Sequence, residues 1–130
     1  MSGAEMTNVD FTSSDMSDSS LVGTDAPFSD FNFATMKDAN ATNAVLHDST
    51  MRWANLHGLI LADADLSRVL FMNSDLSGAD FRGAKLQDTG FAYANLTNAN
   101  FDGTDLGSVD LGGAILTGAH LHCKNNPVCN

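Results

Sequence analysis

The chain of 130 residues is poor in basic residues and has no long apolar run. Only six Lys and Arg accompany 16 Asp and Glu, which gives a formal net charge of −10 at pH 7. Because the six cations are scattered, no basic stripe forms, and direct binding to nucleic acid or to an anionic membrane is disfavoured. No secretory signal, transit peptide or transmembrane run is visible. We therefore expect no membrane insertion, and either a cytosolic protein or a mature chain without its leader.

Cysteine is equally scarce, and both cysteines lie at the end of the chain. A disulfide between Cys123 and Cys129 would close a short loop containing Pro127 and shield the last backbone edge. It would indicate an oxidising compartment. Two other interpretations remain open: free thiols at a frayed terminus, or a metal site formed with His120 and His122. The spacing of these four residues matches no common zinc framework.

What the sequence does contain is one unbroken repeat. Every fifth residue from Met6 to Leu121 is apolar, and these 24 positions, called centres below, hold twelve Leu, six Phe, four Met and two Ala. Two residues before each centre stands a small or modest side chain, most often Ala. A five-residue period matches neither the strand period of 2.0 nor the helix period of 3.6. It predicts a repeat architecture in which each unit is stabilised by its neighbours.

Segments 79–83, 94–98 and 99–103 read Ala-(Asp/Asn)-(Leu/Phe)-x-x. This motif resembles that of the pentapeptide-repeat proteins, and the resemblance covers residues 4–123. It implies an all-β fold, a right-handed quadrilateral (square) parallel β-helix of about six coils with four pentapeptides each. We expect one domain over 1–130, with repeats over 4–123 and a cysteine-closed cap over 123–130. Members of this family from the thylakoid lumen resemble this chain in ending with a cysteine pair.

A square turn places each residue above the residue twenty positions earlier, so the centres should form inward ladders. The aromatic members of two ladders are Phe11, Phe31, Phe71 and Phe91, and Phe81 and Phe101. Seven glycines stand two residues after a centre and are expected at corners, where a residue without Cβ eases the turn. They are Gly23, Gly58, Gly78, Gly83, Gly103, Gly113 and Gly118.

Both the start of the chain and its second coil are expected to be weak. Ala26 and Ala41 replace large centres, and Pro27 is expected to interrupt hydrogen bonding, so mobility should be higher before residue 45. No amphipathic helix precedes Met6 to cover the first core layer. Either residues 1–3 and a looser first coil cover it, or it pairs in an end-to-end homodimer through the N-terminal coil.

Ten of the acidic residues stand immediately before a centre, at outward positions. Pairs one coil apart, such as Asp10 and Asp30, could serve as acid and base or hold Ca²⁺. A solvated face is the simpler interpretation. Asp65, Lys85 and Asp105 form a similar outward ladder of alternating charge. Flat walls offer no converging reactive groups, so we expect neither an enzyme nor a cofactor or metal site.

Three aromatic residues outside the core frame share one phase of the twenty-residue turn: Phe33, Trp53 and Tyr93. They should line one edge of one wall, with Asn73 in the gap. Such a strip on a soluble protein usually has a partner. The alternative is that the rings fold back over the corner and shield backbone. The expected interaction surface comprises Phe33, Arg52, Trp53, Leu70, Met72 and Tyr93.

The expected function is a non-enzymatic scaffold that binds another, unidentified protein. The family resemblance implies one alternative, a DNA mimic that binds DNA gyrase or topoisomerase in the manner of quinolone-resistance proteins. Summed by coil, however, the charge runs −4, −2, −1, −1, −1 and −2, which imitates evenly charged phosphate poorly. A second alternative is a thylakoid-lumen or periplasmic protein of unknown role. The cysteine pair slightly favours such an oxidising compartment, which includes the secreted case.

Overall fold

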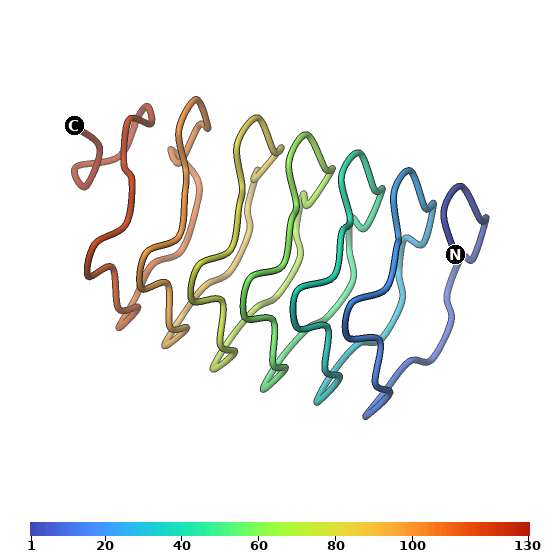
Figure 1. Cartoon of the computed structure of the whole chain (residues 1–130). Coiled ribbons are helices and arrows are strands. Elements are labelled where there is room, and N and C mark those ends of the chain that lie inside the picture. Colours follow the sequence, from blue (N-terminus) through green and yellow to red (C-terminus); the bar gives the residue numbers. More distant parts are fainter.

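The computed structural model describes all residues 1–130 and shows a rod of stacked coils (Figure 1). It contains no α-helix and no strand longer than a single residue. The residue before a centre pairs in parallel with the residue twenty positions later, as Glu5 does with Asp25 and Asp10 with Asp30; before the last coil the exceptions are Lys85, which has no such partner, and Asp105, which pairs with Lys124. One coil therefore takes twenty residues, and the expected all-β quadrilateral helix is confirmed.

The two residues after a centre form a corner. At most corners the third residue after the centre donates its N–H to the carbonyl of the centre, as Ala34 does to Phe31 at 3.1 Å. The second corner residue has positive φ, for example 59° at Phe33 and 67° at Gly58. Positive φ at this place is the mark of a type II turn, which favours glycine. All seven glycines expected at corners lie there with positive φ, so this prediction is confirmed.

Pro27 does not interrupt the hydrogen bonds between coils, and the expectation that it would was wrong. Its neighbours Ala26 and Phe28 both donate N–H bonds to the next coil, to the carbonyls of Val45 and His47 at 2.8 and 3.1 Å. Pro27 occupies the first corner position, whose N–H takes no part in the ladder in any coil. Proline also suits this position of a type II turn because its φ is fixed near −65°.

The core is a column of stacked centres. Phe81 stacks on Phe101 with ring centroids 4.8 Å apart, and Phe71 stacks on Phe91 at 5.0 Å. The two stacks meet edge to face across the interior, as between Phe81 and Phe91 at 5.4 Å. Offset-stacked and edge-to-face pairs are the favoured aromatic geometries. The expected inward aromatic ladders are therefore present.

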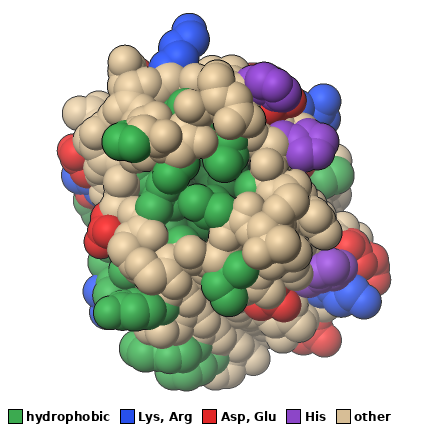
Figure 2. Space-filling view, turned by 90° about the vertical axis from the view of Figure 1, so that its left-hand side faces the viewer, with side chains coloured by type: hydrophobic (Ala, Val, Ile, Leu, Met, Phe, Trp, Pro, Cys, Tyr) green, Lys and Arg blue, Asp and Glu red, His purple; other side chains and the backbone are tan.

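Both ends of the column remain partly open. The amino group of Met1 bonds to the Ser20 carbonyl at 2.9 Å, and residues 1–3 add one more corner instead of folding under the column. Met1 is 47% exposed, and Met6 and Phe11 are only half-buried. Residues 1–3 cover the side of the first layer beneath Leu21, which is 3% exposed, and leave the side at Met6 and Phe11 open, so the expected cover is partial. At the C-terminal end, Figure 2 shows a hollow floored by hydrophobic side chains.

Candidate protein-interaction surface

The corner geometry explains why three aromatic side chains lie outside. A second corner residue with positive φ directs its side chain away from the column, and Phe33, Trp53 and Tyr93 have φ of 59°, 52° and 59°. Their exposed fractions are 56%, 54% and 69%. We call these three residues the aromatic corner. Figure 2 shows hydrophobic side chains projecting from one edge of the rod.

The three rings are ordered along the rod. Phe33 and Trp53 lie face to face with centroids 5.6 Å apart and planes 8° apart. Tyr93 leans over Gly113, where an added Cβ would come within 2.6 Å of the Tyr93 ring. The exposed Asn73 occupies the level between Trp53 and Tyr93, as the sequence predicted. The Tyr93 ring thus covers the backbone of the next corner at Gly113, as one of the two interpretations expected, and all three rings are nevertheless more than half exposed.

The wall beside the aromatic corner is apolar and carries one unpaired cation. Leu70 and Met72 are half-buried, and a Leu70 methyl group lies over Gly90. Arg52 is also half-buried, its Nε is buried without a hydrogen-bond partner, and it forms no ion pair in the chain. The structure thus places the six residues of the expected interaction surface on one corner and its adjoining wall.

The outward acids have a structural role that sequence reasoning missed. A carboxylate or amide oxygen before a centre accepts the N–H of the first corner residue, as Asp10 does from Thr12 at 2.8 Å. This bond replaces the ladder bond that the first corner N–H lacks. Hydrogen bonds from Thr12 lower the pKa of Asp10, and those from Ser17 lower the pKa of Asp15. The preference of Asp and Asn for such local turns could have revealed this role.

Several other acids are neutralised within the chain. Arg68 donates from Nε and Nη2 to Asp48 at 2.6 and 2.8 Å, and His47 Nδ1 lies 2.7 Å from the same carboxylate. The hydrogen bonds from Arg68, which have the larger effect, and from His47 hold the pKa of Asp48 well below its usual range. Asp80 is paired with Arg82, which lowers the Asp80 pKa. The outer acids therefore form a fragmented surface with local ion pairs.

The expected charge ladder of Asp65, Lys85 and Asp105 forms only in part. Lys85 Nζ lies 3.6 Å from Asp65, whereas Asp105 accepts bonds from the Gly107 N–H and from Asn125. The expectation failed at Asp105 because Lys85 and Asp105 do not pair across their coils. The segment is bonded to the cap, where the Leu106 N–H donates to the Lys124 carbonyl at 2.9 Å.

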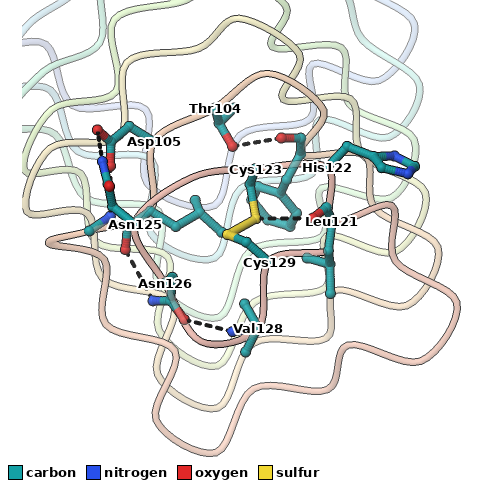
Figure 3. Close-up of a disulfide and its surroundings, with 12 residues drawn as sticks. Thr104, Asp105, Leu121, His122, Cys123, Asn125, Asn126, Val128 and Cys129 are labelled. Carbon is teal, nitrogen blue, oxygen red and sulfur yellow. Dashed lines mark hydrogen bonds between the residues drawn. A yellow bond between two sulfur atoms is a disulfide. The ribbon is translucent and has the colours of Figure 1, made fainter.

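The cap closes as the cysteine pair predicted (Figure 3). A disulfide joins Cys123 and Cys129, whose Cα atoms are 5.0 Å apart. Cys123 is buried, with an exposed fraction of 8%. The coil beneath the cap is one residue short, since Asp105 pairs with Lys124. His122 Nδ1 contacts Asp102 at 3.1 Å, and no group of His, Cys, Asp or Glu is arranged to hold a metal ion. The alternative of a site built on His120 and His122 thus has no geometry to support it.

The expectation that the chain is not an enzyme stays a prediction. The structure has no helix long and apolar enough to cross a membrane. Its one groove lies on a different wall from the aromatic corner, between segments 84–87 and 105–108.

The fold and its outward corners define a protein of the parallel β-helix class that displays side chains on flat walls. A family model described as pentapeptide repeats matches eight copies over residues 1–25, 28–58, 49–88 and 91–123. The chain therefore belongs to the pentapeptide-repeat family. A comparison with curated protein sequences finds no match.

Several solved structures are similar to this chain in fold. QnrB1, described as a plasmid-mediated fluoroquinolone resistance protein, is 16% identical over 95% of this chain and 73% of its own, with a TM-score of 0.65. The protein alr5209 from Nostoc PCC 7120 is 24% identical over 88% of this chain and 84% of its own, with a TM-score of 0.59. Rfr23 from the cyanobacterium Cyanothece 51142 is 17% identical over 98% and 89%, with a TM-score of 0.51. At these identities the likeness concerns the fold alone.

Proposed function

We propose that this protein is a non-enzymatic scaffold whose protein partner binds the aromatic corner. The observation that carries the proposal is the exposed stack of Phe33 and Trp53, with Tyr93 on the same edge of the rod. Rings that are more than half exposed gain apolar contact when a partner covers them, and Trp and Tyr are enriched among residues that dominate binding energy.

Rigidity supports the same assignment. The aromatic residues stand on corners whose backbones are hydrogen-bonded to the next coil, as Trp53 N–H is to the Met72 carbonyl at 3.1 Å and Tyr93 N–H to the Gly112 carbonyl at 2.8 Å. A partner therefore meets a surface that is already ordered, which lowers the entropic cost of binding. Arg52 adds a cation that no carboxylate of the chain neutralises, and an acidic group of the partner could pair with it.

The distribution of charge favours apolar recognition over imitation of DNA. Asp48, Asp65 and Asp80 are paired with cations of the same chain, so the acidic field is interrupted along the rod. Binding through the aromatic corner should persist at high salt, because apolar contact is not screened. Binding to gyrase as a DNA mimic should instead weaken steeply as salt rises.

The test is site-specific photo-crosslinking. A benzophenone side chain replaces Tyr93 in one variant and Asn98 in the control, since Asn98 is an exposed second corner residue on the neighbouring corner. We expect one protein to be crosslinked from position 93 and not from position 98, and to be retained at high salt. The identified protein, once purified, should bind the Trp53→Ser and Tyr93→Ser variants at least about tenfold more weakly, the loss of about 1.4 kcal/mol.

Equal crosslinking from both positions would contradict the proposal, and so would unchanged affinity of both serine variants. Salt-sensitive binding to gyrase that survives both substitutions would favour the DNA-mimic alternative. An end-to-end homodimer through the N-terminal coil would appear as a dimer in sedimentation that Met6→Asp and Phe11→Asp abolish while the aromatic corner variants retain it.

A further inference from the structure

The edge of the rod that carries the aromatic corner has one coil without a ring between two coils that have one. The second corner residues along this edge are, in order, Ser13, Phe33, Trp53, Asn73, Tyr93 and Gly113. Asn73 is exposed, and its side chain is much shorter than those of Trp53 and Tyr93 on either side. We call the space beyond the Asn73 side chain, between the two rings, the Asn73 level.

The two rings that flank the Asn73 level each have one face covered on the side away from it. Phe33 stacks on the N-terminal face of Trp53, with planes 8° apart. The Tyr93 ring lies over Gly113, one coil further toward the C-terminus. The faces that remain open therefore look toward each other across Asn73. The exposed fractions of 54% for Trp53 and 69% for Tyr93 agree with one open face on each ring.

The distance between these open faces suits one further ring. Neighbouring coils lie about 4.8 Å apart, so Trp53 and Tyr93 are separated by roughly 10 Å along the rod. A ring at the Asn73 level would lie about 5 Å from each of them. Inside the column the same coil spacing produces stacked rings, as between Phe71 and Phe91 at 5.0 Å. Offset stacking at such distances is a favoured aromatic geometry.

We propose that an aromatic side chain of the partner inserts at the Asn73 level and completes the stack from Phe33 to Tyr93. This inference rests on the proposed function and names the group that the aromatic corner recognises. The inserted ring would be covered on both faces, whereas a ring placed elsewhere along the edge would be covered on one at most. The exposed Asn73 amide can bond to a polar edge of the guest, such as an indole N–H or a phenol hydroxyl.

The charges around the Asn73 level indicate that the partner carries an acidic residue beside its ring. The Arg52 guanidinium makes no hydrogen bond and no ion pair in the chain, and its two Nη atoms are not buried. Thr50 and Leu70 stand on the same wall at positions where other coils carry Asp or Asn, so no carboxylate of these coils competes for Arg52. A carboxylate of the partner could pair with the free Nη atoms of Arg52.

One substitution would fill the Asn73 level with a ring of the chain itself. Phe28 and Phe33 are second corner residues with φ of 59°, so this corner position accepts phenylalanine. Asn73→Phe should therefore fold, and its ring should stack on Trp53 as Trp53 stacks on Phe33. Asn98→Phe is the matched control, because Asn98 is an exposed second corner residue on the neighbouring corner. Urea unfolding of both variants would establish that they are folded.

The first test uses two synthetic peptides as probes, acetyl-Asp-Trp-amide and acetyl-Asp-Leu-amide. Binding is followed by NMR at the Asn73 side-chain amide and the Trp53 indole N–H. We expect the Trp peptide to shift both resonances with a Kd in the millimolar range, and the Leu peptide to bind at least about tenfold more weakly. Asn73→Phe should bind the Trp peptide at least about tenfold more weakly than the wild type, whereas Asn98→Phe should bind it equally.

Three results of this test would overturn the inference. The first is equal binding of the Trp and Leu peptides, because insertion of a ring requires a planar guest. The second is a Trp peptide that shifts neither the Asn73 amide nor the Trp53 indole. The third is Asn73→Phe binding the Trp peptide as tightly as the wild type does, since the ring of the variant should already occupy the Asn73 level.

The second test distinguishes this inference from the proposed function. The partner crosslinked from position 93 should bind Asn73→Phe at least about tenfold more weakly than the wild type and Asn98→Phe equally. If it loses affinity for Trp53→Ser but binds Asn73→Phe as tightly as the wild type or more so, it contacts the rings only from outside. The proposed function would then stand, and the insertion would be wrong. A failure to crosslink any protein from position 93 would instead count against the proposed function itself.

Discussion

The indole of Trp53 lies flat against the ring of Phe33, one coil earlier in the rod, with centroids 5.6 Å apart. The two residues are twenty positions apart in sequence, and each is more than half exposed. Their contact exists because the repeat places equivalent corner residues directly above one another. It converts two separate surface rings into one ordered apolar ridge.

This stack should contribute to stability as well as to binding. Stacked aromatic pairs contribute about 0.5–1.5 kcal/mol beyond their buried area. A double-mutant cycle with Phe33→Ala and Trp53→Ala should therefore give a coupling energy in this range, measured by urea unfolding. The control cycle pairs Trp53→Ala with Tyr93→Ala and should give none, because Asn73 separates the two rings. Equal coupling in both cycles would refute the stacking geometry.

The inward rings should matter far more than the outward ones. Phe81 is fully buried, stacks on Phe101 at 4.8 Å and meets Phe71 and Phe91 edge to face. Its replacement by alanine should lower the free energy of unfolding by about 3–5 kcal/mol. Phe33→Ala should cost about 1 kcal/mol or less, since its ring is largely solvated. Similar losses for both variants in denaturant unfolding would show that the assignment of inward and outward phases is wrong.

Much of this arrangement could be predicted from the sequence, because each pentapeptide repeats the same instructions. The apolar centres specified the ladders of Phe71 and Phe81, and the common phase of Phe33 and Trp53 placed both on one corner. The loss of backbone hydrogen bonds between segments 83–88 and 102–108 could not be predicted. It depends on the path of the cap beyond the last repeat and on the backbone conformation of Ser108, neither of which follows from the five-residue pattern.

Pro27 shows a second limit of sequence reasoning. Proline usually removes a ladder bond, but the structure has no ladder donor at the first corner position. Pro27→Ala should therefore lower the free energy of unfolding by about 0.4–1 kcal/mol, because alanine has more freedom in the unfolded chain. Phe28→Pro, one residue later, should be far more damaging, since Phe28 has φ of 59° and donates to the His47 carbonyl. A gain of stability in Pro27→Ala would contradict this account of the corner.

The pair of Asp48 and Arg68 should make stability depend on acid pH. Asp48 accepts hydrogen bonds from Arg68, which have the larger effect, and from His47. They hold the pKa of Asp48 below its value in the unfolded chain, which is about 3.9. A depressed folded pKa gives stability that is present above about pH 4 and is lost as the pH falls through the folded pKa. Asp48→Asn should therefore lower the free energy of unfolding at neutral pH. The difference in this free energy between the variant and the wild type should shrink below about pH 4.

The matched control is Asp63→Asn, because Asp63 is also a second corner residue but makes no ion pair. Unfolding by urea at several pH values, at low salt, would measure both variants. If the difference in free energy of unfolding between Asp48→Asn and the wild type stays constant from neutral to acid pH, the Asp48 carboxylate does not cause the loss of stability in acid.

The disulfide should hold the last coil in place. Lys124 accepts the Leu106 N–H and donates to the Thr104 carbonyl, and both bonds lie beside Cys123. Cys123→Ser with Cys129→Ser should lower the free energy of unfolding by about 2 kcal/mol, toward the lower end of disulfide effects because the loop is short. Amide exchange should accelerate first at Leu106 and Lys124, with Leu61 and Leu66 as internal controls. Unchanged exchange at Leu106 would show that the cap is held without the bond.

The five-residue register leaves the aromatic corner outside the column, and the single tryptophan of the chain reports on this directly. The most direct measurement is quenching of Trp53 fluorescence by iodide in the folded protein, compared with the urea-unfolded chain. We expect red-shifted emission and quenching at roughly half the efficiency of the unfolded chain, in keeping with an exposed fraction of 54%. Blue-shifted emission that iodide does not quench would place Trp53 inside the protein and contradict the register.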